Sequence, residues 1–281
     1  MTTTQTRRFC YHLTEAPLAP GEVAIVGAGP GDPGLLTLRA LSLLQQAECL
    51  VFDRLVSQDV LAMAPPSAQS YYVGKASRCH AMTQEQTNAL MVKLSREGKR
   101  VVRLKGGDPF IFGRGGEEAE YLIDHQVAFR VVPGITSASG CSTYAGFPLT
   151  HRDHAQSVTF VTGHCKGDNC LGLNWDALAA PHQTVVFYMG LANAALISRE
   201  LMQRGLPGSH PVALVERGTT HDQRQVLTSL NELVETIARE DFKPPTLIVV
   251  GEVVRLMDTL DVVQPQQVNA ETHEIVGAVA W

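Results

Sequence analysis

Apolar residues along the chain gather in short runs that alternate with segments of helical spacing. The first run, VAIVG at residues 23–27, is rich in β-branched residues and predicts a buried strand. A glycine-rich turn follows it, then a segment of helical spacing, LLTLRALSLLQQA, and a second strand, CLVFD, at residues 49–53. The alternation continues through SYYVGK, a helix over residues 84–97 that Gly98 closes, the strand-and-turn segment VVRLKGGDPF and the turn-and-helix segment GRGGEEAEYLIDHQ. Strands that alternate with helices predict an α/β domain with a mostly parallel sheet.

The pattern is interrupted at FRVVPGITSASG, where Pro133 and Gly134 break the regular structure. A second set of strands follows: SVTFVTGH, TVVFYMG, PVALVERG and PTLIVVG. We therefore expect a domain boundary near Pro133. The expected parts of the chain are a flexible tail (1–20), an N-terminal α/β domain (21–133), a C-terminal α/β domain (134–263) and a C-terminal tail (264–281).

Composition favours a soluble globular protein over other classes. Of 281 residues, 44% are hydrophobic and 18% are charged, and no run of 18 apolar residues predicts a membrane span. The net charge of −5 disfavours a general nucleic-acid binder, which needs an excess of Lys and Arg. The six cysteines form no C-x-x-C motif, and Arg7-Arg8 precedes no apolar stretch of the kind found in a signal peptide. We expect free thiols, no metal site and a cytoplasmic location.

The first glycine-rich turn, Gly29 to Gly34, matches the G-x-G-x-x-G pattern between a strand and a helix. Asp53 lies 19 residues after Gly34, which is also the arrangement of a dinucleotide-binding fold. Against that interpretation, Pro30 and Pro33 lack the N–H groups that phosphate needs, and Asp32 adds a negative charge. An NAD site, a turn that admits another ligand and a tight turn without ligand all remain open.

A second turn, KGGDPF, follows the strand that ends at Lys105. It lacks the order of a P-loop, but Gly106 and Gly107 expose backbone atoms at the carboxyl end of a strand, where α/β proteins bind ligands. Asp108 either accepts hydrogen bonds from a ribose or an amino group, or caps a helix that begins at Pro109; both roles are compatible. A third turn, VPGITS, places small hydroxyl residues at the crossing between the domains.

Taken together, these segments resemble the tetrapyrrole methylase family. The matching stretches run in order from residue 21 to about 256, and they are VGAGPGDPGLLTLRA, VFDRLVS, VGK, RLKGGDPFIFGRGGEE, VVPGITSASGCSTYAGFPLTHRD, VTGH, VFYMGL, PVALVERGT and PTLIVVG. The resemblance implies two α/β domains with mostly parallel sheets and the active site in the cleft between them. It also implies a homodimer that uses S-adenosyl-L-methionine to methylate uroporphyrinogen III twice, at C2 and C7. The products would be precorrin-2 and S-adenosyl-L-homocysteine.

The resemblance also assigns site residues. The implied cofactor contacts are Pro30, Gly106, Gly107, Asp108, Ile111, Thr136, Ser137, Met189 and Gly218. Asp53 and Lys75 match the positions of the proton acceptor and donor, although a strand-end Asp and Lys also serve to order a cleft.

The chemistry of the substrate adds further candidates. A polyacidic macrocycle needs local arginines, and Arg114 and Arg152 are the best placed in the motifs. Glu117, like Asp53, is a candidate to take the proton from the methylated ring, the alternative being a first-turn acid favoured by the helix dipole. Met189 packs either on the macrocycle and sulfonium or in the core.

Rival functions stay open at this point. An NAD-dependent oxidoreductase fits the first glycine turn, and a non-catalytic ligand-binding module fits the fold. Within the family, a later corrinoid or an RNA is the alternative acceptor. The downstream pathway, whether siroheme, cobalamin or another modified haem, is not encoded in these motifs.

Overall fold

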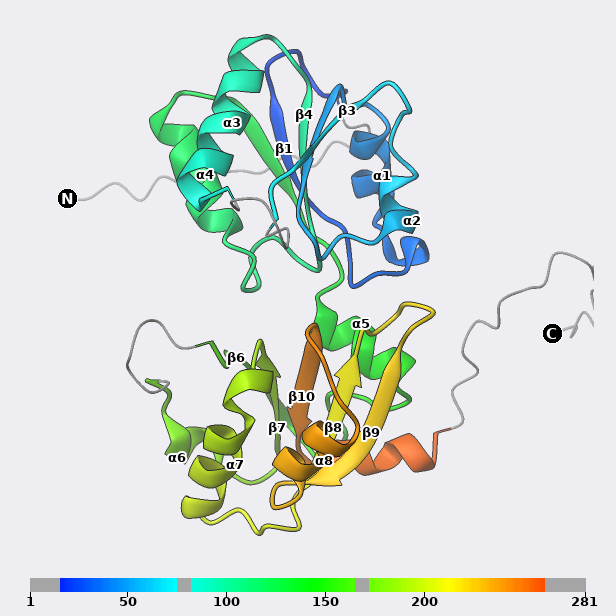
Figure 1. Cartoon of the computed structure of the whole chain (residues 1–281), viewed down its shortest axis with the longest axis vertical. Helices are drawn as coiled ribbons and strands as arrows, with labels where there is room; N and C mark the ends of the chain where they lie inside the picture. The colour runs from blue at the N-terminus through cyan, green and yellow to red at the C-terminus, as the bar shows by residue number, and fades with distance from the viewer. Residues whose placement is uncertain (1–15, 75–81, 165–171, 261–281) are drawn as a thin grey trace, which may run out of the picture. The chain divides into compact units, whose positions relative to one another are not determined.

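The computed structural model of the chain describes residues 16–74, 82–164 and 172–260 (Figure 1). The chain divides into two compact units between Ile135 and Thr136. Each unit is built on one five-stranded sheet. In the described segments, no helix has the length and apolar character needed to cross a membrane.

The first sheet is parallel throughout, with the strand order β3-β2-β4-β1-β5. Its strands are β1 (Val23–Gly27), β2 (Cys49–Phe52), β3 (Gln69–Tyr72), β4 (Val101–Lys105) and β5 (Phe129–Val132). Because all five strands run the same way, their carboxyl ends meet at one edge of the sheet. The predicted parallel α/β arrangement is confirmed for this unit.

Helices cover both faces of the first sheet, as Figure 1 shows. The helical elements are η1 (Pro33–Leu35), α1 (Leu38–Leu44), α2 (Gln58–Leu61), α3 (Gln84–Arg96) and α4 (Gly115–Asp124). One face packs Ile25 with Met91 of α3 and Leu122 of α4, whereas the other packs Val26 with Leu43 of α1. Burial on both faces explains why the central strand β1 is a continuous run of apolar residues, whereas the edge strand β3 is largely exposed.

The helix after KGGDPF begins later than its sequence pattern indicates. A cap at Asp108 would start the helix at Pro109, but α4 begins at Gly115. The backbone N–H of Gly115 donates to the carbonyl of Pro109 at 2.9 Å, so the intervening segment folds back as a loop. Arg114 precedes the helix with a left-handed φ of 61°.

The second sheet has the order β6-β7-β10-β8-β9 and is mostly antiparallel. Its strands are β6 (Ser157–Thr162), β7 (Gln183–Tyr188), β8 (Pro211–Glu216), β9 (Arg224–Ser229) and β10 (Thr246–Val250). Only β6 and β7 pair in parallel among them. The expectation of a mostly parallel sheet is therefore wrong for this unit.

The missed strand β9 is the reason for that error. Its sequence, RQVLTS, has few apolar residues because the strand lies at an edge and is not fully buried. It pairs with β8 through a short hairpin loop at 217–223, and β10 then inserts between β7 and β8, antiparallel to both.

The helical elements of the second unit are α5 (Ser137–Tyr144), α6 (Trp175–Leu178), η2 (Leu191–Asn193), α7 (Ala194–Gln203), α8 (Leu233–Arg239) and η3 (Glu252–Asp258). The core of this unit packs Phe187 of β7 and Ile248 of β10 against Ile197 of α7 and Leu233 of α8. These side chains are fully buried.

Candidate functional site

Three glycines bring the carboxyl ends of β1, β4 and β5 into backbone contact. Gly29 and Gly107 exchange two hydrogen bonds, from Gly29 N at 3.2 Å and from Gly107 N at 2.6 Å. A Cβ atom built on Gly27 would lie 2.5 Å from the backbone nitrogen of Gly134 and 2.8 Å from the carbonyl oxygen of Gly107. We call Gly27, Gly107 and Gly134 the glycine cradle; a side chain at Gly27 or Gly134 has no room.

Replacing Gly134 by alanine is expected to lower the free energy of unfolding by about 1–3 kcal/mol, because its new methyl group would meet backbone atoms of Gly27 and Gly107 that cannot rotate away. The matched control is Gly116→Ala, since a Cβ there meets nothing within 4 Å. Better helix propensity makes that control neutral or more stable by up to about 1 kcal/mol. Urea unfolding of both variants checks this, and equal stability of the two would contradict the close approach.

Carboxylates flank the glycine cradle on two loops. Asp32 Oδ1 accepts from Gly34 N at 2.7 Å and caps η1. Asp108 Oδ1 accepts from Phe110 N at 2.8 Å, and its Oδ2 accepts from Gly134 N at 3.1 Å. Both loops are thus negative where a pyrophosphate would need positive partners.

The first glycine turn also lacks the helix that a dinucleotide site uses. In such a site the glycines run directly into a helix whose N-terminus faces the pyrophosphate. Here residues 33–35 form the single turn η1, and α1 begins at Leu38 with its N-terminus capped by the hydroxyl of Thr37. This geometry argues against the NAD alternative.

Asp53 lies at the end of β2, on the same sheet edge, and both of its carboxylate oxygens have partners. Oδ1 accepts from Leu55 N at 3.1 Å, and Oδ2 accepts from the Arg103 guanidinium at 3.2 Å. The next residues of this loop are also close to the other loops, since Leu55 would touch a Cβ on Gly106 and the Ser57 hydroxyl donates to Gly31 O at 2.7 Å.

Behind Asp53 lies a set of buried charges that sequence reasoning missed. Glu118 of α4 is fully buried, and its Oε1 accepts from Arg103 Nε at 3.0 Å, Lys105 Nζ at 2.9 Å and Gln84 Nε2 at 3.1 Å. Burial, followed by repulsion from Arg103, lowers the pKa of Lys105. We call Asp53, Arg103, Lys105 and Glu118 the buried charge network.

A signal for this network was present in the sequence. Arg103 and Lys105 stand two residues apart in an apolar strand, so they share one face of the sheet. Two cations on a face covered by helices need an acid in the covering layer. Glu118, the second acid of GGEEAE, provides it, whereas its neighbour Glu117 is exposed.

Arg114 and Glu117, both predicted site residues, pair with each other at the start of α4. Arg114 Nε donates to Glu117 Oε1 at 2.9 Å, and a second bond joins Nη2 to Oε2 at 2.5 Å. Both side chains are about half exposed. The hydrogen bonding of Arg114 to Glu117 raises the pKa of Arg114. Lys75, the predicted proton donor, lies outside the described residues.

The remaining predicted residues of the first unit lie on loops at the same sheet edge. Pro30 is partly exposed in the turn after β1, and Ile111 is partly exposed in the loop after β4. The structure therefore brings together Pro30, Gly106, Gly107, Asp108, Ile111 and Asp53 around the carboxyl ends of neighbouring strands.

In the second unit, the predicted cofactor residues gather around α5 and the end of β7. The hydroxyls of Thr136 and Tyr188 are hydrogen bonded at 2.6 Å, and the Tyr188 oxygen also accepts from Ala138 N at 3.0 Å, so Tyr188 caps α5. Met189 follows with a left-handed φ of 54° and is 52% exposed, which rules out the core alternative for it.

Ser137 and Gly218 belong to this group as well. Ser137 is the first residue of α5, and a Cβ on Gly218 would collide with the sulfur of Cys141 in the same helix. Cys141 is buried against Gly218, and its burial raises the pKa of the thiol to about 12.

Arg152 is exposed in a turn of the second unit that His151 and Ala155 close with two backbone hydrogen bonds. Nδ1 of His151 accepts from Asp153 N at 3.2 Å, and the rings of His151 and His154 lie 4.8 Å apart. Within the described ranges, no group of three or more His, Cys, Asp or Glu residues is arranged to hold a metal.

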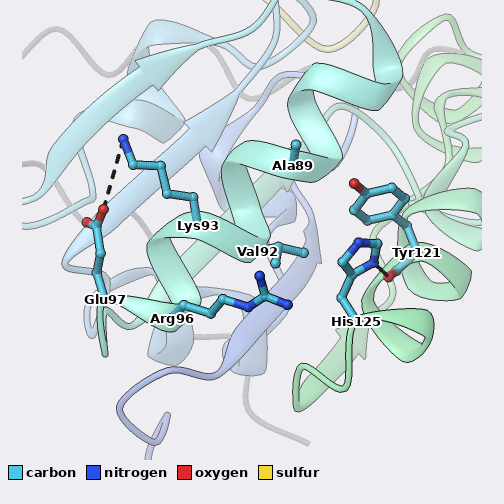
Figure 2. Close-up of a pocket in the computed structure, with 7 residues that line it drawn as sticks. All are labelled: Ala89, Val92, Lys93, Arg96, Glu97, Tyr121 and His125. Atoms are coloured by element: carbon cyan, nitrogen blue, oxygen red, sulfur yellow. Dashed lines mark hydrogen bonds and ion pairs between the residues drawn. The ribbon is translucent and has the colours of Figure 1, made fainter.

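A separate hollow of about 390 Å³ lies between α3 and α4 (Figure 2). The rings of Tyr121 and His125 stack there, 4.1 Å apart, and Nδ1 of His125 donates to the Tyr121 carbonyl at 2.8 Å. None of its lining residues is a predicted site residue. They are Ala89, Val92, Lys93, Arg96, Glu97, Tyr121 and His125.

Comparison with known proteins places these observations in a family context. Residues 22–234 match the family model of the tetrapyrrole (corrin/porphyrin) methylases. The siroheme synthase of Azotobacter vinelandii is 57% identical over 245 residues, which cover 87% of this chain and 53% of that protein. The siroheme synthase of Nitrosomonas europaea is 55% identical over 240 residues, covering 85% and 50%. The chain spans about half the length of the curated relatives it matches.

Solved structures give the same picture. A uroporphyrin-III C-methyltransferase from Thermus thermophilus, in complex with S-adenyl homocysteine, matches with a TM-score of 0.72 and 40% identity, covering 84% of this chain and 94% of that one. A cobalt precorrin-4 methyltransferase matches with a TM-score of 0.75 and 28% identity, covering 83% and 96%.

Proposed function

Because the chain belongs to the family of tetrapyrrole (corrin/porphyrin) methylases, we propose that it transfers methyl groups from S-adenosyl-L-methionine to uroporphyrinogen III. Membership confirms the resemblance seen in the motifs and the expected class of enzyme, a methyltransferase. The finer proposal is that two carbons, C2 and C7, are methylated, giving precorrin-2 and two molecules of S-adenosyl-L-homocysteine. The solved neighbour with bound S-adenyl homocysteine supports the choice of cofactor.

The observation that carries the proposal is the glycine cradle with Asp108 beside it. The glycines let the ends of β1, β4 and β5 pack backbone to backbone, and the two carboxylates on the flanking loops suit a cation and hydroxyl groups better than phosphates. Each oxygen of Asp108 has one backbone donor and retains a further lone pair for a ribose hydroxyl. These residues fit S-adenosylmethionine, which when bound supplies a methyl group activated by a sulfonium cation.

We assign the cofactor contacts to residues of both units. The first unit contributes Pro30, Gly106, Gly107, Asp108 and Ile111, and the second contributes Thr136, Ser137, Met189 and Gly218. Within each unit these residues lie on loops at strand ends or, for Ser137, at the start of α5.

Substrate binding is assigned to Arg114, Arg152 and Met189. Arg114 and Arg152 are exposed and carry guanidinium groups that suit carboxylates. Met189 offers an exposed apolar side chain for the macrocycle. Because the pyrrole carbon is itself electron rich, catalysis consists mainly of orientation, which is worth up to roughly 7–11 kcal/mol in well-aligned systems.

The proton chemistry falls to carboxylates. When the new C–C bond forms, the macrocycle becomes cationic; one C–H bond then breaks, its electron pair returns to the ring system and the proton goes to a carboxylate. We assign Asp53 as the acceptor, with Glu117 as the second candidate, and Lys75 as a donor. Arg114 holds both carboxylate oxygens of Glu117 by paired hydrogen bonds.

Calorimetric titration separates this function from the oxidoreductase alternative. The protein is expected to bind S-adenosyl-L-homocysteine with micromolar or tighter affinity and to show no heat with NAD. A matched variant, Gly106→Ala, is expected to lose the binding, since its Cβ would lie 2.7 Å from Cβ of Leu55 and displace the loop. Binding of NAD without a response to S-adenosyl-L-homocysteine would contradict the proposal.

We further propose that the protein is a homodimer, as the family resemblance implies, and that it works in the cytoplasm. Light scattering after gel filtration tests the dimer directly, with a monomer mass as the contradicting result. Siroheme formation is the pathway that its 57%-identical relatives favour, and the same product also suits cobalamin or another modified haem.

A further inference from the structure

We propose that Arg103 is a positioning residue that orients Asp53 for proton transfer, and that Glu118 and Lys105 fix Arg103 for this task. The inference rests on the proposed function, in which Asp53 accepts the proton of the methylated macrocycle. Arg103 itself does not touch the substrate, because it is 3% exposed within the first unit.

Asp53 is held at both of its carboxylate oxygens. Leu55 N donates to Oδ1 at 3.1 Å, and Arg103 donates to Oδ2 at 3.2 Å. The Asp53 side chain is 27% exposed, so it remains accessible to a ligand at the sheet edge. Two anchors fix one side-chain orientation, which a general base needs before proton transfer.

Arg103 is itself held by hydrogen bonds on several sides. Its Nη1 donates to the carbonyl of Leu104 at 3.0 Å and approaches that of Val51 at 3.4 Å, while Nε donates to Glu118 at 3.0 Å. The planar guanidinium thus links an acid on a helix to an acid at a strand end. Lysine, with a single nitrogen, cannot maintain these contacts together.

The buried charges lie at a position in the fold that stability alone does not explain. A buried ionic network is seldom the most stable solution, since apolar residues of similar volume often stabilise as well or better. Here two cations and two anions balance each other at the carboxyl ends of parallel strands, where α/β proteins bind ligands. Asp53 is the member of this network that is accessible, and Arg103, Lys105 and Glu118 are buried. This arrangement is what a supported catalytic carboxylate requires.

In the proposed proton transfer, every bond that breaks is matched by a bond or electron pair that forms. A C–H bond of the methylated macrocycle breaks, its electron pair returns to the ring, and an O–H bond forms on Asp53. The acid then returns the proton to water before the next methyl transfer, and no oxidant or reductant is involved.

A double-mutant cycle tests the inference on the full chain. Asp53→Asn, Arg103→Lys and the double variant are compared in kcat for methyl transfer to uroporphyrinogen III and in Kd for S-adenosyl-L-homocysteine. Each single variant is expected to lower kcat about a hundredfold. The kcat of the double variant is expected to lie no more than about threefold below that of the less active single variant. The Kd of all three stays near that of the wild type. Multiplied losses in the double variant, or wild-type kcat in either single variant, would overturn the role of Arg103.

A second variant, Asp53→Glu, covers the case in which Arg103→Lys does not fold. It keeps the carboxylate but moves it one carbon away from Leu55 and Arg103. If orientation matters, kcat falls as in Asp53→Asn; if basicity alone matters, kcat stays within about threefold of the wild type, and the inference fails. A wild-type protein that transfers no methyl group overturns the proposed function and this inference together, whereas an active wild type with multiplied losses overturns the inference alone.

Discussion

Replacement of Glu118 by leucine is expected to lower the free energy of unfolding by about 3–5 kcal/mol, the usual cost of removing one partner from a buried ion pair. Glu118 is fully buried in α4, and its Oε1 is the common acceptor for Arg103 and Lys105. Without the Glu118 carboxylate, Arg103 and Lys105 remain buried and have no acidic partner on α4. The loss far exceeds that from a surface pair, which is worth about 1 kcal/mol or less.

Urea unfolding measures this effect, with Glu120→Leu as the control. Glu120 lies on the same helix but is exposed, so the identical substitution is expected to change the free energy of unfolding by no more than about 0.5 kcal/mol. Similar stability of the two variants would show that Glu118 does not act as the counter-ion of Arg103 and Lys105.

Replacement of Arg114 by lysine is expected to lower kcat/KM for uroporphyrinogen III by about 10- to 100-fold while leaving the Kd for S-adenosyl-L-homocysteine unchanged. Lysine keeps the positive charge but loses the fork with which Arg114 holds both oxygens of Glu117. The left-handed backbone at this position is equally strained with either side chain, so the comparison isolates the guanidinium group.

The control for Arg114 is Arg96→Lys, in the hollow between α3 and α4. That hollow contains no assigned substrate or cofactor residue, so kcat/KM is expected to stay within about twofold of the wild type. Equal losses of turnover and cofactor binding in Arg114→Lys would contradict its assignment to the substrate.

Much of the first unit could be predicted because its central strands β1, β2 and β4 are buried on both faces. Continuous apolar runs such as VAIVG admit few alternatives, and their carboxyl ends meet at one edge in a parallel sheet. The position of the glycine turns directly after these runs therefore predicts the sheet edge on which they lie. The start of α4 was harder to predict, because Gly115 packs back on Pro109 through contacts that no local pattern encodes.

The strands of the second unit were harder to predict than those of the first. Strand β9 is an edge strand that is only partly buried, so its apolar content falls below what periodicity detects. Missing it also meant missing the hairpin that makes the sheet mostly antiparallel. Glu118 is hard to predict for a related reason, because GGEEAE contains two adjacent acids that look alike in the sequence. Successive residues of a helix point in different directions, so Glu118 contacts the buried cations whereas Glu117 pairs with Arg114.

The most direct test of the account is the mass of the tetrapyrrole product. Uroporphyrinogen III is incubated anaerobically with the protein and S-adenosyl-L-methionine carrying a deuterated methyl group. The account predicts a tetrapyrrole that has gained two labelled methyl groups, with two S-adenosyl-L-homocysteine molecules released for each. A tetrapyrrole that gains no label, while the cofactor binds, would contradict the central claim that this chain methylates uroporphyrinogen III.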